Sequence, residues 1–343
     1  MFALLLGVRL VYLFRYRVNS DEPQHLHVVW AWAQGMIPYR DFFDNHTPLF
    51  HILCIPFLCL IGERPDAIVL MRLVVFPLYL LTLVFTYRIA CLVSTRRAAL
   101  WATFFTALSP FMFLEMLEFR TDDLWTFLWL ATVLVLLSKP LTVARMFIVG
   151  ILLGAALSVS MKTVLFLMVL GATALAILVM MRRDREGPPP RVLAGWACAA
   201  LSGFLVFPVA LLLFFAYQRA LPQLLYCTIE HNALPGAGPG YLHMFLFLPA
   251  AWFWIWAIRR AHRRHGSAAA AAREIVVISA CILYLAILLT LWPVVETQDC
   301  PPCTPFIFIL IARLILPERE KALDVARPKA WRPLVSRHIN YDT

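Results

Sequence analysis

The residues best suited to chemistry lie just after the first apolar stretch of the chain. Asp21 and Glu22 are adjacent carboxylates, and His25 and His46 follow shortly after them. Ionisable groups beside a membrane segment are costly and usually have a function. A carboxylate can accept a proton from a hydroxyl group, so this segment predicts acid–base chemistry. The alternative is that the acidic pair only caps an interfacial helix that begins near Pro23.

A second group of charged residues lies between two later apolar runs. It contains Glu118, Arg120 and Asp122. An arginine among carboxylates keeps them ionised, and an ionised carboxylate can serve as a base. The alternative is a solvated turn whose charges form local ion pairs.

Lys162 is the most informative single cation, because it is one of only four lysines and stands between two apolar runs. An ammonium group at that position is suited to binding an anion, and a lipid phosphate is the natural candidate. The alternative is that the side chain extends to ordinary lipid headgroups.

Other candidate residues give weaker signals. A predicted outer loop, residues 218–243, carries His231 and Tyr241. We assign both to the vicinity of the acceptor or substrate, together with Glu118, His25 and His46. A divalent metal ion could also be bound by histidines of this region with Asp21 or Glu22, although the spacing of His25, His27, His46 and His51 matches no metal-binding motif.

The composition defines the class of protein that must position these residues. The chain has 343 residues, of which 62% are hydrophobic and 15% are charged, and its mean hydropathy is +0.78. Soluble domains are about 45–50% apolar and about 25% charged. We therefore predict an all-α polytopic membrane protein. The net charge of +10 lies in short clusters between apolar runs, which indicates membrane topology and argues against nucleic-acid binding.

The arginine clusters predict the topology. Clusters that share the cytoplasmic side must be separated by an even number of spans. This condition is met if residues 47–62 do not cross the membrane, and it gives about ten transmembrane helices plus juxtamembrane helices in a first outer loop, residues 17–67. The transmembrane domain is then residues 1–316, followed by a short basic cytoplasmic tail, residues 317–343. The first apolar run, Met1 to Phe14, is short for a span and indicates a shortened N-terminus.

The predicted topology sorts the charges by side. The candidate acid–base residues and Lys162 lie on the outer side, whereas the inner loops carry mostly arginine. We therefore expect a multi-pass protein of the inner (plasma) membrane with its site on the extracytoplasmic side. The main rival is a lipid or sugar transporter, or a flippase. Transporters of that kind have charged residues at mid-span and symmetric halves, and neither is evident in the sequence.

Three stretches carry a resemblance to a known family. They are residues 20–58, which include DEPQHLHVVWAWAQGMIPYRDFFDNHTPLF, residues 118–130 (EFRTDDLWTFLWL) and residues 158–165. In this order they resemble the GT-C superfamily of integral-membrane glycosyltransferases, in the bacterial branch related to protein O-mannosyltransferases and to the lipid A aminoarabinose transferase. The chain is shorter than many members, and we expect no soluble C-terminal domain.

The resemblance implies an inverting transfer of a hexose or pentose from a polyprenyl-phosphate carrier to a lipid, glycan or protein acceptor of the cell envelope. By the matching motif, Asp21 would be the general base, and Glu22 would orient it or help to bind the acceptor. Asp122 would be the second family carboxylate. Lys162 and Arg120 would hold the carrier phosphate. His46 stands near a position where some members have a charged pair before proline, so the resemblance assigns it no role.

Overall fold

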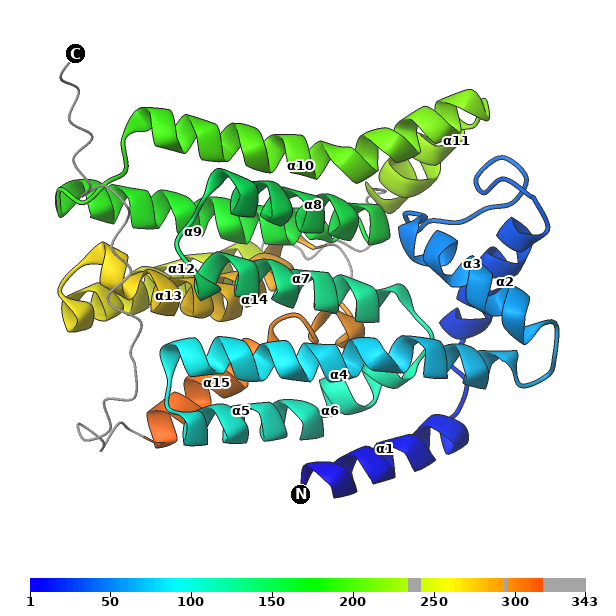
Figure 1. Ribbon diagram of the computed structural model, residues 1–343, viewed down its shortest axis with the longest axis horizontal. Helices are drawn as coiled ribbons and strands as arrows, with labels where there is room; N and C mark the ends of the chain where they lie inside the picture. Colours follow the sequence, from blue (N-terminus) through cyan, green and yellow to red (C-terminus); the bar gives the residue numbers. More distant parts are fainter. Residues whose placement is uncertain (234–241, 293–294, 317–343) are drawn as a thin grey trace, which may run out of the picture.

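The structure is a computed structural model that describes residues 1–233, 242–292 and 295–316. The described residues form helices and connecting turns, with no β-strand among them and a single isolated bridge between Pro38 and Phe42. Most of the helices run along one common direction (Figure 1). The all-α class predicted from the sequence is therefore confirmed.

Five described helical segments are long and apolar enough to cross a membrane, and a sixth is counted if a pair bent by 67° forms one span. The bent pair is α5 (Arg96–Leu108) with α6 (Pro110–Phe113) and the turn that follows it. Among the described residues the structure thus supports a membrane protein of five or six candidate spans, fewer than the ten that the sequence predicted. The five are α4 (Ala67–Val93), α7 (Thr121–Ser138), α9 (Thr163–Arg183), α10 (Pro190–Tyr217) and the continuous segment Ala268–Leu291.

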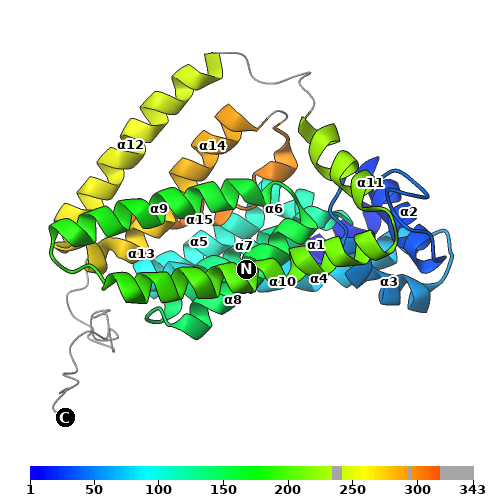
Figure 2. The ribbon, with the colours of Figure 1, turned by 90° about the horizontal axis from the view of Figure 1, so that it is seen from above.

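The last of these segments contains α13 (Ala268–Ile278) and α14 (Tyr284–Leu291). Four further helices belong to the bundle, namely α1 (Phe2–Arg15), α8 (Val143–Val159), α12 (Leu242–His265) and α15 (Thr304–Ile315). Figure 2 shows that α12 diverges from the rest of the bundle toward its N-terminal end.

Two short helices occupy the predicted first outer loop. They are α2 (Asp21–Ala33) and α3 (Leu49–Ile61). At 1.5 Å per residue, the 13 residues of α3 extend about 20 Å, which is less than the hydrocarbon thickness of a bilayer. With α11 (Leu221–Leu225), these helices lie together at one end of the molecule (Figures 1 and 2).

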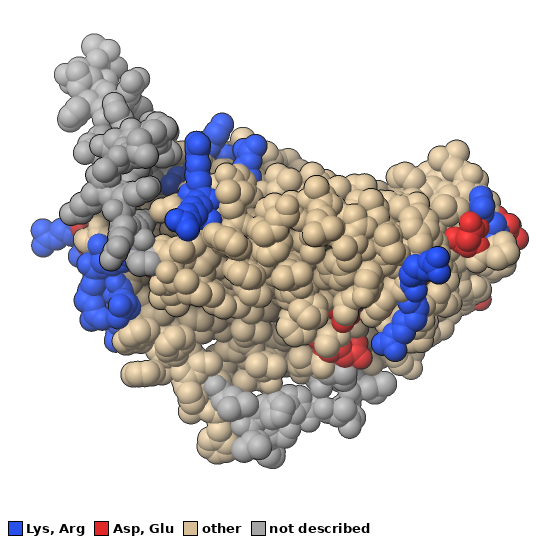
Figure 3. Space-filling view, turned by 90° about the horizontal axis from the view of Figure 1, so that it is seen from below, with Lys and Arg blue, Asp and Glu red and all other residues tan. Residues whose placement is uncertain are grey.

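Charges are segregated between the two ends of the bundle. The turns between α4 and α5, α7 and α8, α9 and α10, and α12 and α13 all lie at the end opposite α2 and α3 (Figure 1). These turns carry the arginine clusters. In Figure 3 most of the visible Lys and Arg gather at that end, and most of the visible Asp and Glu lie away from it. The arginine clusters therefore share one end, as the sequence predicted.

Aromatic packing fixes α7 against α9 and so places the residues at their outer ends. Phe166 stacks on Trp125 and Trp129, with ring centroids 4.5 and 4.2 Å apart. Trp125 Nε1 also donates a hydrogen bond to Thr163 Oγ1 at 3.0 Å. Thr163 directly follows Lys162, so this contact ties the start of α9 to the first turn of α7.

Candidate functional site

Four segments that are far apart in the sequence meet at the end of the bundle beside α2. They are the first turn of α2, the start of α7, the residue before α9 and the turn before α15. Arg120 lies at the centre of this cluster. Its guanidinium is 2.8 Å from Asp21 Oδ2, 3.2 Å from Glu118 Oε2 and 3.5 Å from Asp122 Oδ2. The structure therefore brings Asp21, Glu118, Arg120 and Asp122 together.

Lys162 joins the same cluster from the other side. Its Nζ lies 3.8 Å from Asp122 Oδ1 and forms an ion pair with Asp299 Oδ1. Asp299 is fully buried and is itself fixed, because its Oδ2 accepts a hydrogen bond from Glu296 N at 3.0 Å and its backbone oxygen accepts one from the Tyr284 hydroxyl at 2.9 Å. The Lys162 ammonium is therefore held by a preformed turn.

Access to the cluster is uneven. The Asp21 side chain is 40% exposed and that of Lys162 is 20% exposed, whereas Arg120, Asp122 and Asp299 are nearly or fully buried. A substrate that approaches this cluster from outside therefore meets one carboxylate and one ammonium group first. Asp21 is the accessible candidate for a base, and Lys162 is the accessible candidate for an anion ligand.

The surrounding charges set the protonation of the cations. Burial alone would lower the pKa of Arg120, but the carboxylates of Asp122, Asp21 and Glu118 outweigh it and raise that pKa. Burial likewise opposes the charge of Lys162, and Asp122 and Asp299 raise its pKa above the ordinary value. Both residues are therefore cations at neutral pH.

Glu118 behaves differently from its neighbours. Burial raises the pKa of its carboxyl above the usual value, although hydrogen bonds from Asn19 and Arg120 act in the opposite direction. Asn19 Nδ2 donates to both carboxylate oxygens of Glu118, at 3.2 and 3.0 Å. Glu118 thus connects the segment before α2 to the segment before α7.

Glu22 lies outside this cluster, on another face of α2. It is fully buried, and its carboxylate oxygens accept hydrogen bonds from Arg72 Nε at 2.7 Å and Arg72 Nη2 at 2.5 Å. It also accepts hydrogen bonds from Phe119 N at 2.8 Å and Asn19 N at 3.0 Å. These contacts enclose the carboxylate, so in this conformation Glu22 offers an acceptor no accessible surface. Through these contacts Glu22 holds α2 against α4 and the start of α7.

Asp21 is not the N-cap of α2. The N-cap residue is Ser20, which makes no side-chain capping bond, and Asp21 is the first helical residue. The capping alternative considered from the sequence is therefore wrong for Asp21, whose carboxylate pairs with Arg120 instead. Both acidic residues lie in the first turn of the helix, which begins at Asp21 and not near Pro23 as the sequence suggested.

The histidines form a separate cluster next to the charged one. His25 Nδ1 lies 3.0 Å from His51 Nε2, and the His25 and His46 ring centroids are 4.7 Å apart. Asp44 lies 3.0 Å from His46 Nδ1 and 3.7 Å from His51 Nδ1. Across the described part of the chain, no three His, Cys, Asp or Glu side chains converge so that they could hold a metal ion.

The other predicted residues lie further out. His231 contacts the ring edge of Phe43, with centroids 5.0 Å apart. Asn232 Nδ2 donates to Asn45 O at 3.0 Å, so the segment around His231 lies against the loop that follows α2. Tyr241 lies outside the described residues.

Sequence reasoning missed several residues that the structure makes important. Asp299 lies 137 residues after Lys162 in the sequence, and nothing in the local pattern indicated their contact. Arg72 was hidden within a long apolar run. Asp123 follows Asp122 directly, but it is fully buried and its oxygens accept no hydrogen bond from the described residues.

No protein-family model matches the sequence, and no curated protein matches it. Two solved structures share the fold. The apo structure of ArnT from Cupriavidus metallidurans has a TM-score of 0.63 and 17% identity, over 90% of this chain and 58% of that chain. The structure of the same protein bound to undecaprenyl phosphate has a TM-score of 0.62 and 16% identity, over 96% of this chain and 61% of that chain.

This likeness bears on the fold. The chain spans about 60% of the length of ArnT, and the low identity leaves residue roles undetermined. The likeness confirms the fold that the motifs implied, because the helical architecture of this chain is shared with both ArnT structures.

Proposed function

We propose that the protein is a membrane glycosyltransferase that moves a sugar from a polyprenyl-phosphate carrier to an acceptor. The observation that carries this proposal is the meeting of an accessible carboxylate, Asp21, with the cations Arg120 and Lys162 at one end of the bundle. The fold supports it, because the ArnT structure with the same architecture was solved with undecaprenyl phosphate bound. That lipid is the kind of molecule that remains after such a transfer.

The reaction assigns each group a task. An acceptor hydroxyl attacks the anomeric carbon, and its proton passes to Asp21 as the new bond forms. The bond between the anomeric carbon and the phosphate oxygen breaks, and the electron pair leaves with the lipid phosphate. Attack from the face opposite the leaving group inverts the anomeric centre. Arg120 and Lys162 stabilise the negative charge that develops on the phosphate.

Charge balance limits how the phosphate enters. Four carboxylates, those of Asp21, Glu118, Asp122 and Asp299, surround two cations. A phosphate must therefore compete for Lys162 with carboxylates that already neutralise it. Burial raises the pKa of Glu118, which favours the neutral carboxyl more than in an ordinary glutamate and so acts against the excess of negative charge.

We assign the site to the extracytoplasmic face of a multi-pass inner-membrane protein. The arginine-rich turns lie at the opposite end of the bundle, and arginine-rich turns favour the cytoplasm. The proposal of ten spans would require the helices α1, α8, α12 and α15 to cross in addition to the six candidate spans. An acceptor that belongs to the cell envelope would then reach Asp21 from outside.

The test is transfer from a labelled polyprenyl-phosphate sugar by the purified protein. Asp21→Asn keeps the size of the side chain but cannot accept the proton, so we expect transfer to fall by roughly 100-fold or more. Asp66→Asn is the control, because Asp66 is an exposed carboxylate that pairs with Arg64 away from the cluster. Full transfer by Asp21→Asn would refute the mechanism, and no transfer by the unmodified protein with any such donor would refute the function.

A further inference from the structure

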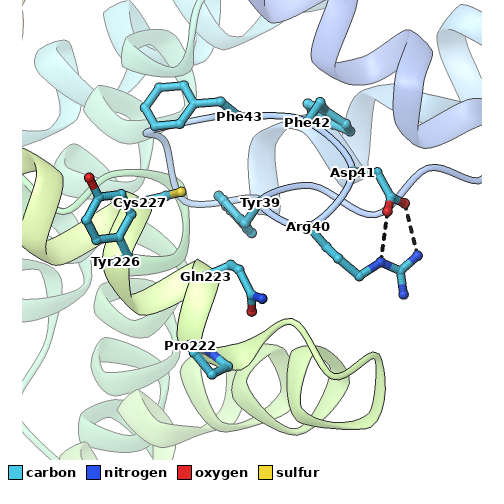
Figure 4. A pocket seen from close by; sticks show the side chains of 9 residues that line it. All are labelled: Tyr39, Arg40, Asp41, Phe42, Phe43, Pro222, Gln223, Tyr226 and Cys227. Atoms are coloured by element: carbon cyan, nitrogen blue, oxygen red, sulfur yellow. Dashed lines mark hydrogen bonds and ion pairs between the residues drawn. The ribbon is translucent and has the colours of Figure 1, made fainter.

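A cavity of about 490 Å³ opens at the same end of the molecule as the candidate site. It lies between loop residues 39–43 on one side and, on the other, α11 with the π-helix that follows it, Tyr226–Glu230 (Figure 4). Its volume falls in the range of about 300–1,000 Å³ that is typical of small-molecule sites. None of its lining residues takes part in the charged cluster around Arg120.

The loop wall of this cavity is built to hold its shape. Tyr39 has a φ of +69°, a left-handed conformation that is strained for a residue other than glycine. Two hydrogen bonds hold Tyr39 there, from its N to Phe42 O at 2.8 Å and from its hydroxyl to His46 O at 2.6 Å. Strained backbone that the surrounding structure holds in place is frequent at binding sites.

The cavity carries no free charge. Arg40 and Asp41 form a two-pronged ion pair, with Nε–Oδ1 at 2.8 Å and Nη2–Oδ2 at 2.9 Å. The remaining guanidinium nitrogen, Arg40 Nη1, donates to Gln218 O at 3.2 Å. A phosphate would therefore find no uncompensated cation in this cavity.

The rest of the lining is aromatic with a few polar groups. Phe43 is 55% exposed and Tyr226 is 52% exposed, so each presents a ring at the rim. The Gln223 side chain is directed into the cavity in Figure 4 and is also exposed. A pyranose ring has an apolar C–H face that packs on aromatic rings and hydroxyl edges that need amide or hydroxyl partners. Both kinds of surface are present here.

A short path of contacts connects this cavity to Asp21. The Tyr39 hydroxyl bonds to the backbone of His46, whose ring contacts that of His25. His25 lies one helical turn after Asp21 on α2, so the two residues lie on the same side of that helix. Lys162 reaches Asp21 by a different path, through Asp122 and Arg120.

We propose that this cavity binds a neutral pyranose ring and that the ring belongs to the acceptor. The assignment of the ring to the acceptor rests on the proposed function, whereas the binding of a sugar in the cavity does not. The class of acceptor is then a glycan or glycolipid in which an uncharged sugar, and not a phosphate, is recognised next to the reacting hydroxyl.

The experiment measures the binding of methyl glycosides to the protein in lipid nanodiscs by saturation-transfer NMR. The panel contains the methyl glycosides of glucose, galactose, mannose and N-acetylglucosamine, with inorganic phosphate as a competitor. We expect at least one glycoside to bind, and Tyr226→Ala and Gln223→Ala to weaken it by roughly threefold to tenfold, as the loss of an aromatic or polar contact does. Gln223 is exposed, so its replacement should leave the fold intact.

Tyr217→Ala is the matched control, because this tyrosine is 84% exposed at the end of α10 and does not line the cavity. The proposal is overturned if no glycoside of the panel binds, if binding is equally strong in Tyr226→Ala and Gln223→Ala, or if inorganic phosphate displaces the glycoside. If the protein binds a glycoside but transfers no sugar, the proposed function is refuted, whereas the sugar-binding site is still supported.

Discussion

Asp21 and Glu22 are adjacent in the chain and have opposite surroundings. Successive residues of an α-helix point about 100° apart, so one carboxylate faces the charged cluster and the other faces the interior. Asp21 is accessible beside Arg120, whereas Glu22 is enclosed by Arg72 and two backbone N–H groups. The pair therefore divides into a candidate base and a structural anchor for the helix that carries that base.

We expect Glu22→Gln to lower the free energy of unfolding by about 3–5 kcal/mol, because it leaves Arg72 as an unpaired buried charge. The measurement is the thermal unfolding midpoint of the purified protein in detergent. Asp66→Asn removes one partner of an exposed ion pair, so the unfolding midpoint should stay close to that of the unmodified protein. Equal midpoints for the two variants would show that the buried pair does not support the fold.

Lys162→Gln tests the proposed phosphate contact. The variant loses a charge-assisted hydrogen bond worth about 1.5–3 kcal/mol, so affinity for undecaprenyl phosphate should fall by roughly tenfold or more. Lys139→Gln is the control, because that lysine is exposed at the arginine-rich end of the bundle. Binding could be followed by quenching of tryptophan fluorescence, and unchanged affinity in a folded Lys162→Gln protein would remove Lys162 from the donor site.

The sequence identified Lys162 but not what holds it. A lone lysine between apolar runs stands out on composition alone. Its partner Asp299 comes from the last turn before α15, and only the packing of α7, α9 and α14 brings the two together. Local patterns carry no information on contacts over such separations, so the site could be predicted in part and its supporting residues could not.

His25 should make the stability depend on pH. Burial lowers the pKa of His25 well below its ordinary value, and His46, His51 and Arg120 lower it further. In the folded protein the His25 side chain thus stays neutral when the pH falls below about 6.5, whereas in the unfolded chain the same side chain takes up a proton at about this pH. Since the unfolded state then binds more protons, the free energy of unfolding falls as the pH drops through this value and is unaffected above it.

We expect His25→Gln to remove this part of the acid sensitivity. His27→Gln is the matched control, because His27 lies two residues later on the same helix and is exposed. Unfolding midpoints measured from about pH 7.5 to about pH 5 should fall less steeply in His25→Gln than in His27→Gln. The raised pKa of Glu118 acts in the opposite direction, but it is common to both proteins and cancels in the comparison. Equal slopes would contradict the assignment.

At the scale of the helices, α8 and α10 pack through small residues. A Cβ on Gly150 would lie 2.0 Å from Ala200 O, and one on Gly154 would lie 2.2 Å from Phe204 O. On the other helix, a Cβ on Gly203 would lie 2.1 Å from Phe147 O. Membrane helices that approach this closely gain van der Waals contact that larger residues would prevent.

Gly154→Ala should therefore separate α8 from α10 and lower the unfolding midpoint. Gly171→Ala is the matched control, because a Cβ at that position of α9 has no atom within 4 Å. Alanine favours a helix over glycine by about 1 kcal/mol, so the control is expected to be neutral or slightly stabilising. A Gly154→Ala protein as stable as the control would show that the two helices can move apart without cost.

Several helices were predictable because their cause is local. An acidic pair followed by proline marks the start of α2, and the short apolar run 47–62 became the short helix α3. The number of spans was less predictable. The segment from Arg96 to Leu117 bends by 67° at Ser109–Pro110, and α8 and α15 are shorter than a straight span. A count of apolar runs does not report where a helix bends or stops.

For the molecule as a whole, the separation of charges between the two ends predicts its orientation. The arginine-rich turns lie at one end and α2, which begins with Asp21, lies at the other (Figure 1). Arginine-rich turns favour the cytoplasm, so Asp21 should face the outside of the cell. The alternation of arginine clusters was sufficient to predict this separation, because charge near span ends is a property of short sequence segments.

Labelling with a membrane-impermeant maleimide on intact cells tests the orientation. Cysteines introduced at Ser20, at Arg96 and at Glu186 are compared in a background where the exposed Cys59 and Cys198 are serine. We expect the cysteine at position 20 to react from outside and the other two to react only after permeabilisation. Labelling at positions 20 and 96 from the same side would require another crossing between α2 and α5, and α3 would then have to span the membrane despite its 13 residues.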